Sequence, residues 1–435
     1  MEYLTKGNPQ QGLWGATLGF FIGFAAVSLF GPTAIKFKEA MELSPLMIAL
    51  LVAMPSLSGS LLRIPFSAWV DIEGGKKPFI ILLILSIIGM MGLSLIINIY
   101  YPHNLTPSFY PILLLLGLLS GCGIATFSVG ISQVSYWFDQ AHEGKELGIY
   151  AGLGNLAPGI FSFLLPVTLA SLGLGGSYLL WLLFLSVGTI IYFFMGKDAW
   201  YFQLLKQGYP AKKAKQIAIK KGQTLFPASN LKSIVTDLKL SGMIWKTWVL
   251  VTIYFTTFGG FIALTAWLPT YWSSFYKVTI ITAGLLTALY SILASLLRVV
   301  GGIISDKLGG MNTTFLSLTI MIVGAVIMIF SRNINISVFA EVLLAIGMGF
   351  GNASVFKLVP QEIPKAIGGA AGWVGGLGAF GGFIIPTSMA VFVKAFGEIG
   401  YALGFIVFII LSILSLILTS ILKHFKSVKR ASGIK

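Results

Sequence analysis

Apolar runs of about 20 residues recur along the whole chain, and this repetition restricts the fold more than any other feature. Each run is long enough for an α-helix to cross the roughly 30 Å hydrocarbon core of a bilayer. Of the 435 residues, 56% are hydrophobic and only 10% are charged, whereas soluble domains carry about 25% charged residues. The chain cannot cover its surface with polar groups, so we predict an all-α protein that crosses the membrane many times.

The runs predict twelve transmembrane helices in two halves of six. A long polar segment separates the sixth helix from the seventh, which gives an N-terminal half at residues 1–196, a linker at 197–245 and a C-terminal half at 246–435. The first run is long enough to remain as a spanning helix instead of a cleaved leader. The predicted spans fall near residues 13–35, 46–70, 78–99, 108–136, 146–172, 176–195, 246–272, 279–304, 313–331, 336–358, 366–393 and 399–422.

The basic residues predict the orientation in the cell membrane, because loops rich in Lys and Arg stay in the cytoplasm. The side that holds both termini and the linker carries 21 of the 29 Lys and Arg residues, and the loops on the other side carry five. Both termini are therefore expected in the cytoplasm. This topology also explains the net charge of +15, so we expect no nucleic-acid partner. Within the linker we predict a basic amphipathic segment on an anionic lipid surface, which contains Lys212, Lys213, Lys215, Lys220 and Lys221.

The two halves share a repeated pattern. Arg63 precedes Asp71 by eight residues in the second span, Arg298 precedes Asp306 by eight in the eighth, and a Gly-Gly pair follows each aspartate. Six spans, a long cytoplasmic loop and six more spans are typical of transporters built from two parallel repeats. At a rise of about 1.5 Å per residue, each arginine lies about 12 Å from its aspartate, near the middle of the membrane. We expect Asp71 and Asp306 to brace the cytoplasmic helix ends and to gate closure there without touching substrate.

Arg63 and Arg298 place two positive charges at a depth where a charge costs several kcal/mol, and a guanidinium group cannot lose its proton. Of the 14 acidic residues, only Glu341 falls inside a predicted span, near the outer end of the tenth. Pairing with a buried carboxylate and snorkelling to the surface are the alternatives, and both explain a symmetric pair poorly. We infer that the substrate is the missing counter-ion, a small planar anion such as nitrate, nitrite or bicarbonate that is held from both sides.

The fifth and eleventh spans are unusually rich in glycine. Small residues allow helices in membranes to approach each other closely. Because the two spans occupy corresponding places in the two halves, we predict sliding surfaces beside the substrate path; static packing is the alternative. The glycines that we single out are Gly152, Gly154, Gly159, Gly372, Gly376 and Gly378.

Together these features resemble the nitrate/nitrite porter family of the major facilitator superfamily. The loops after Asp71 and Asp306 resemble the cytoplasmic loop signature of the superfamily, and GLGN at residues 152–155 is similar to the nitrate signature of the family. The second copy, GLGA at residues 376–379, departs from it at Ala379. The resemblance implies a secondary transporter that moves nitrate, nitrite or both by alternating access, either by exchange or with protons. It also implies a set of substrate-binding residues, namely Arg63, Arg298, Asn155, Tyr254 and Phe258.

The sequence leaves the mode of coupling open. The three histidines fall in loops or the C-terminal tail, so proton coupling would use Glu341, Lys357, a tyrosine or the anion itself. Lys357 could also stabilise the negative end of its helix. No span holds a histidine, and Cys122 is the single cysteine, so we expect no enzyme, no catalytic residue, no metal and no cofactor. A monomeric carrier in lipid is expected; a carrier of another small anion (bicarbonate, formate or an organic acid) and a nitrate sensor that transports nothing are the alternatives.

Overall fold

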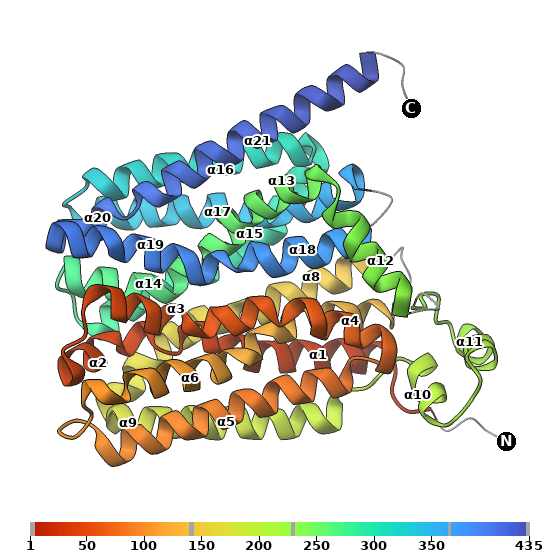
Figure 1. Cartoon of the computed structure of the whole chain (residues 1–435), viewed down its shortest axis with the longest axis horizontal. Coiled ribbons are helices and arrows are strands. Elements are labelled where there is room, and N and C mark those ends of the chain that lie inside the picture. Colours follow the sequence, from red (N-terminus) through yellow and green to blue (C-terminus); the bar gives the residue numbers. More distant parts are fainter. Residues whose placement is uncertain (1–4, 139–142, 228–230, 364–366, 432–435) are drawn as a thin grey trace.

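The computed structural model of the chain is an elongated bundle of helices (Figure 1). It describes residues 5–138, 143–227, 231–363 and 367–431. The helices of the N-terminal half are α1 (Pro9–Phe24), α2 (Ala34–Met41), α3 (Pro45–Leu61), α4 (Arg63–Glu73), α5 (Lys76–Tyr100), α6 (Tyr110–Gly121), α7 (Thr126–Ser135), α8 (Glu143–Gly154) and α9 (Leu156–Met195). Those of the C-terminal half are α13 (Trp245–Tyr254), α14 (Gly260–Phe275), α15 (Ile280–Leu308), α16 (Gly310–Phe330), α17 (Ile334–Glu362), α18 (Ile367–Ala379), α19 (Gly381–Phe396), α20 (Gly400–Leu403) and α21 (Ile406–Ala431).

The described residues confirm an all-α protein with many membrane-spanning helices. Eleven stretches among them are long and apolar enough to cross a membrane, one fewer than the twelve predicted spans. The difference arises because the fifth and sixth predicted spans form one helical run, Glu146–Met195. Gly173 interrupts that run with φ 67° and ψ −178°, so it consists of two helices across a kink, and the fold is consistent with twelve helices.

Several spans are interrupted along their length, and three of these interruptions bear on the site. In the second span α3 ends at Leu61 and α4 begins at Arg63, and in the fifth Asn155 separates α8 from α9. The seventh span contains a π-helical turn, η5 (Phe255–Gly259), between α13 and α14, and such turns are frequent at functional sites. Arg63, Asn155 and Phe258 therefore all lie at or within helix interruptions, and all three are buried.

The backbone repeats the pattern that the sequence shows around the two aspartates. Gly74 follows the last residue of α4 with φ 83°, and Gly309 follows the last residue of α15 with φ 84°. Only glycine adopts this left-handed region without steric cost. Each glycine comes three residues after its aspartate, so the second and eighth spans end in the same way.

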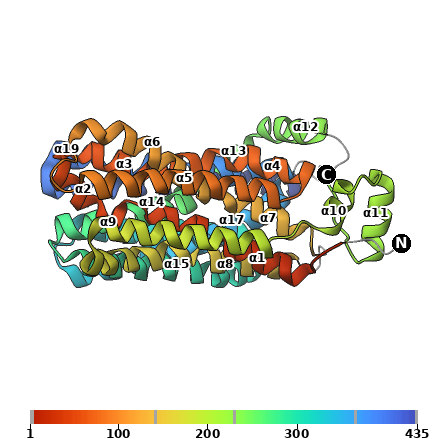
Figure 2. The same ribbon diagram turned by 90° about the horizontal axis from the view of Figure 1, so that it is seen from below.

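The linker forms three helices, α10 (Trp200–Lys206), α11 (Ala211–Lys220) and α12 (Leu231–Gly242). They lie at one end of the bundle, which we call the linker end; the other is the opposite end (Figures 1 and 2). Asp198 attaches the start of the linker to the N-terminal half: it accepts a hydrogen bond from the backbone N–H of Lys76 and pairs with Lys206. On the other half, the indole N–H of Trp373 in α18 donates to the carbonyl of Leu238 in α12.

Helix α11 is basic and amphipathic, as the sequence predicts, but its apolar face is covered. Ala214, Ile217 and Leu204 of α10 form a small apolar cluster of their own. The lysines of α11 are exposed. The small apolar face of α11 thus packs against α10, and contact of the exposed lysines with a lipid surface stays a prediction.

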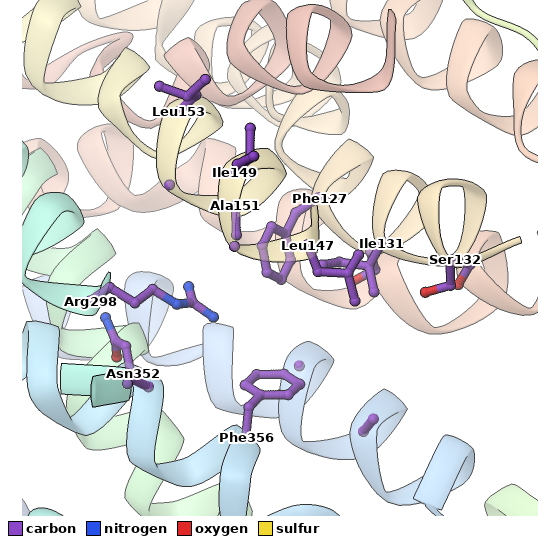
Figure 3. Close-up of a pocket in the computed structure, with 18 of the residues that line it drawn as sticks. Phe127, Ile131, Ser132, Leu147, Ile149, Ala151, Leu153, Arg298, Asn352 and Phe356 are labelled. Carbon is purple, nitrogen blue, oxygen red and sulfur yellow. The ribbon is translucent and has the colours of Figure 1, made fainter. Parts of the chain in front are cut away.

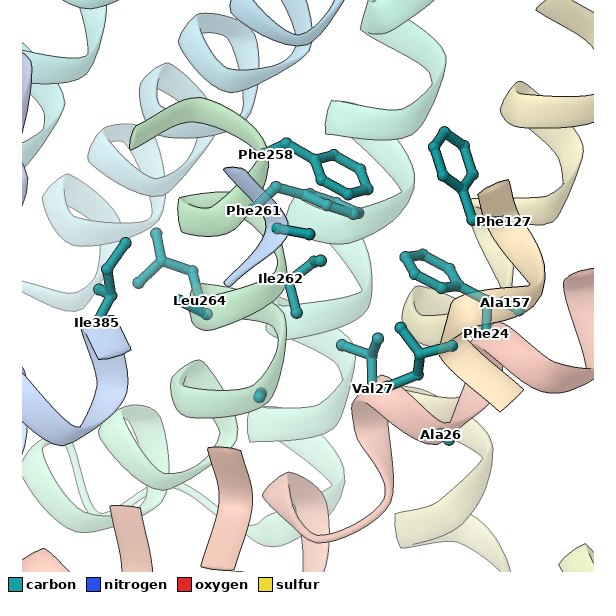
Figure 4. Close-up of a cluster of buried hydrophobic side chains, with 14 of the residues drawn as sticks. Phe24, Ala26, Val27, Phe127, Ala157, Phe258, Phe261, Ile262, Leu264 and Ile385 are labelled. Atoms are coloured by element: carbon teal, nitrogen blue, oxygen red, sulfur yellow. The ribbon is translucent and has the colours of Figure 1, made fainter. Parts of the chain in front are cut away.

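An apolar cluster with members from both halves closes the bundle toward the opposite end (Figure 4). Phe24 of α1 stacks on Phe258 with 6.5 Å between ring centroids, and Phe127 of α7 lies 5.8 Å from Phe258. The two halves also meet at glycines near that end. A Cβ on Gly31 would lie 2.4 Å from the Ala266 carbonyl oxygen, so the two halves touch through their backbones.

Candidate functional site

A cavity of about 1340 Å³ lies between the two halves. Its wall includes Arg63 and Phe127 from the N-terminal half and Arg298 and Phe356 from the C-terminal half; Figure 3 shows Arg298, Phe127 and Phe356 around the same space. Asp71, Asp306 and the linker residue Leu225 also line it. Since α4 and α15 both end at the linker end just after these aspartates, the cavity extends from the arginines toward that end.

Arg63 is held firmly, although it carries a charge in the middle of the bundle. It is 1% exposed. Its Nε donates to the carbonyl of Gly59 at 3.0 Å, and its Nη1 donates to the carbonyl of Gly375 at 3.2 Å. Gly375 belongs to α18, so the second bond joins the two halves. The remaining nitrogen, Nη2, is buried without a partner.

Arg298 comes from α15, and its Nη1 is also buried without a hydrogen-bond partner. Its guanidinium carbon lies 5.8 Å from the centroid of Phe127 and 5.7 Å from that of Phe258. The corresponding distances for Arg63 are 4.9 and 5.2 Å. Two guanidinium groups, one from each half, therefore contact the same two rings.

No protein carboxylate neutralises this pair within the described residues. Asp71 and Asp306 are the carboxylates on the described cavity wall, and both are engaged elsewhere. The Tyr136 hydroxyl donates to Asp71 at 2.5 Å, and Lys357 Nζ lies 2.5 Å from Asp306. Aromatic faces offset part of the charge through cation–π contacts worth about 0.5–2 kcal/mol each. The site is thus strongly electropositive and has unused N–H donors.

Tyr254 and Phe258 lie beside the arginines, although neither is part of the cavity wall. Their rings stack with centroids 4.9 Å apart, and Tyr254 meets Phe356 edge to face at 5.0 Å. The Tyr254 hydroxyl interacts with Arg298, but it has no hydrogen-bond partner of good geometry. It remains available as a donor next to the arginine pair.

Asn155 is buried between α8 and α9 and does not line the cavity. Its carbonyl accepts a hydrogen bond from Ser295, one turn before Arg298, and its side-chain Oδ1 has no partner. Asn352 of α17 does line the cavity, and its Oδ1 also lacks a partner. Asn352 therefore faces the cavity more directly than Asn155 does, although the sequence analysis did not single it out.

The singled-out glycines divide into two groups. A Cβ on Gly154 would lie 1.8 Å from the Phe20 ring, and one on Gly378 would lie 2.6 Å from the Tyr254 ring. Gly159 and Gly376 likewise lie against side chains of the other half, Ile292 and Ile64. In contrast, Gly152 and Gly372 belong to the cavity wall, and a Cβ would meet nothing closer than 3.5 Å.

The two residues considered for coupling lie in different surroundings. Lys357 pairs with Asp306 and donates to the Ser305 carbonyl at 2.7 Å, so it ties α17 to the end of α15. Glu341 is fully buried near the start of α17. Its Oε1 accepts a hydrogen bond from the Trp272 indole at 3.1 Å, while its Oε2 has no partner.

Three site features were missed in the sequence: the Phe127 ring, the Gly375 carbonyl and the Asn352 amide. A repeated pattern marks the segments that hold two of them, although both residues fall at its variable positions. G-x-G-x4-S-V occurs at residues 121–129 in the fourth span and at 347–355 in the tenth, and it contains Phe127 and Asn352. A backbone acceptor such as Gly375 leaves no such signal.

Comparisons with known proteins agree with this architecture. The family model of the Major Facilitator Superfamily matches residues 16–386. Among solved structures, the fold is similar to a partially occluded inward open conformation of the xylose transporter XylE from E. coli, with a TM-score of 0.71 and 14% identity over 94% of this chain and 97% of that one.

Three curated relatives match over most of their lengths. The "Probable nitrate transporter NarT" of Staphylococcus epidermidis is 29% identical over 95% of this chain and 97% of its own. The "Probable nitrate/nitrite antiporter NarK1" of Thermus thermophilus is 28% identical over 92% and 89%, and the "Nitrite extrusion protein" of Bacillus subtilis is 27% identical over 89% and 88%. With the match to the family model, which spans most of the sequence, the conclusion is that the chain belongs to the Major Facilitator Superfamily and is a membrane carrier, not an enzyme.

Proposed function

We propose that this protein is a secondary transporter that carries nitrate and nitrite across the cell membrane by alternating access. The observation that carries the proposal is the arginine pair: two guanidinium groups from different halves share two aromatic rings, and each keeps a buried N–H without a partner. Buried charges in proteins are normally paired. An anion bound between Arg63 and Arg298 would supply the missing partner.

The size and shape of the anion follow from the groups around it. A forked guanidinium binds planar oxyanions through two parallel hydrogen bonds, and the flat faces of Phe127 and Phe258 favour a thin ligand over a bulky one. Nitrate and nitrite have this shape. The names of the relatives, a nitrate transporter, a nitrate/nitrite antiporter and a nitrite extrusion protein, support the same choice.

We assign roles to the nearby residues on the same basis. Arg63 and Arg298 bind the anion, the Tyr254 hydroxyl donates a further hydrogen bond, and Phe258 limits the thickness of the site. Asn155 acts as a polar neighbour at the helix junction. Asp71 and Asp306 serve as gating groups at the linker end, which we propose faces the cytoplasm because that side carries most of the Lys and Arg residues.

The test uses purified protein in liposomes that contain nitrite, with labelled nitrate outside and no gradient of pH or voltage. Uptake that requires internal nitrite would establish exchange. Uptake that instead requires an inward proton gradient would establish symport. An excess of unlabelled bicarbonate, formate or acetate outside reports the selectivity.

Three outcomes would contradict parts of this proposal. Competition by bicarbonate or formate as strong as that by nitrite would assign the site to another small anion. Nitrate binding without movement under either condition would indicate a sensor. If neither binding nor movement of nitrate is detected, the anion is a different one.

A further inference from the structure

Glu341 is a buried acidic residue that takes no part in the proposed anion site. It is 0% exposed and lies in α17, eight residues after the N-terminal cap Asn333, so about 12 Å below the opposite end. One carboxyl oxygen accepts from Trp272 of α14, and the other has no partner. A fully buried carboxylate needs several donors or a cation to stay ionised.

No cation faces it. The helices packed against α17 are α13, α14, α15, α16 and α18, together with η5. Helix α16 has no titratable residue, and neither does the described sequence of η5 or α18. The nearest titratable groups are two tyrosines that interact with Glu341, Tyr271 of α14 and Tyr290 of α15. The other titratable residues of these packed helices lie toward the linker end, and they are Lys246, Tyr254, Arg298, Asp306 and Lys307.

The surroundings of Glu341 differ on its two sides along α17. Toward the opposite end, one turn earlier, the Ser337 hydroxyl hydrogen-bonds the Tyr276 hydroxyl at 2.6 Å, and Tyr276 is only partly buried. Toward the linker end, the next residues on the same face are fully buried and apolar, Leu344, Ala345 and Met348. Hydroxyl groups thus lie between the carboxyl and the opposite surface, while apolar side chains separate it from the cavity.

We propose that Glu341 is a proton-binding site that controls closure of the opposite end. The closed arrangement seen here buries the carboxyl, and it does so with the proton on Glu341 Oε2. When that end opens, water reaches the carboxyl and the proton exchanges with the solution on that side. Closure from the ionised form therefore takes one proton from that solution and becomes less favourable as the pH there rises.

The proposal rests on the proposed function in one respect only: its test uses nitrate movement as the readout. The experiment measures nitrate/nitrite exchange in liposomes with protein oriented so that the opposite end faces outward, at external pH values from 5.5 to 8.5 and constant internal pH. The wild-type rate should fall as external pH rises. In Glu341→Gln the amide oxygen can still accept from Trp272 and the group is always neutral, so the rate should stay at its low-pH level throughout.

Glu398→Gln is the matched control, because Glu398 lies at the same end but is exposed and pairs with Lys277. It should retain the wild-type pH dependence. The proposal is overturned if Glu341→Gln keeps that dependence, or if it binds nitrate in detergent yet transports none at any pH. Absence of nitrate movement by the wild type would refute the proposed function instead.

A second measurement needs no variant. Dicyclohexylcarbodiimide reacts with protonated carboxyls in apolar surroundings, and peptide mass spectrometry identifies the modified residue. We expect modification of Glu341 at neutral pH, with loss of transport, and none at Glu398. Glu341 that stays unmodified at neutral pH would contradict a carboxyl that holds its proton.

Discussion

The guanidinium groups of Arg63 and Arg298, which come from different halves of the chain, contact the same two rings, Phe127 and Phe258. They are not equivalent, however. Both keep a buried N–H without a partner, but Arg63 is fixed by two backbone carbonyls, one of them across the interface at Gly375, whereas Arg298 is held by aromatic rings and by its contact with Tyr254. We infer that Arg63 forms a fixed side of the anion site and that Arg298 adjusts to the anion.

Lysine in place of either arginine should weaken nitrate binding by about 10- to 100-fold. A lysine keeps the charge but loses the fork, and a hydrogen bond to a charged group is worth about 1.5–3 kcal/mol. Arg63→Lys should also lower the thermal stability, because the Gly59 and Gly375 carbonyls lose their donor. Titration of the detergent-solubilised protein measures the affinity. Arg332→Lys is the control, since Arg332 binds the carbonyls of Ile329 and Ser331 away from the cavity.

Phe127→Leu should weaken nitrate binding by about 3- to 30-fold. The ring contacts both guanidinium groups, and a cation–π contact contributes about 0.5–2 kcal/mol. Phe161→Leu removes a ring that packs on Trp181 and Phe184 instead, so it should leave the affinity unchanged. Equal effects of the two substitutions on binding would show that Phe127 matters only for packing.

Larger side chains at the glycines where the halves meet should hold the opposite end open. A Cβ on Gly284 would lie 2.3 Å from the carbonyl oxygen of Ser162, so Gly284→Leu cannot adopt the conformation seen here. We expect nitrate binding to persist and transport to stop. Gly324→Ala is the control, since its close contacts at Ala340 and Leu344 lie within one half.

Cysteine labelling reads out the conformation of that variant. Ser128 lines the cavity, and Cys122 is the single cysteine, so Ser128→Cys in a Cys122→Ser background reports access. The reporter should react from the linker side in the parent and lose that reactivity with Gly284→Leu. Unchanged labelling from the linker side would argue against the steric block.

The ion pair between Lys357 and Asp306 should affect anion passage more than stability. The lysine side chain is 26% exposed and the aspartate 78%, and such pairs contribute only about 0–1 kcal/mol. Lys357→Met leaves a bare carboxylate beside the cavity and should slow nitrate transport strongly, whereas Asp306→Asn leaves no bare carboxylate and should slow it less. The exchanged pair, Lys357→Asp with Asp306→Lys, should recover part of the rate; initial rates in liposomes test this order.

The sequence predicts the fold well because lipid imposes simple rules: apolar length gives the spans, and a buried arginine requires a partner. The repeat of Arg63 and Asp71 at Arg298 and Asp306 was readable for the same reason. The role of Phe127 was not readable from the sequence, because only tertiary packing selects this ring among the 33 phenylalanines. The Gly375 acceptor could not be predicted either, because it is a backbone atom. The packing partner of α11 was equally open, because its apolar face fits a lipid surface as well as it fits α10.

The central claim is that Arg63 and Arg298 bind the same anion, and a double-mutant cycle tests it most directly. Nitrate affinity is measured for the wild type, Arg63→Gln, Arg298→Gln and the double variant. If both groups hold one anion, each single variant should lose most of the binding and the double variant should lose little more, which gives a coupling energy well above zero. Losses that simply add would contradict a shared anion and assign the two arginines to separate tasks.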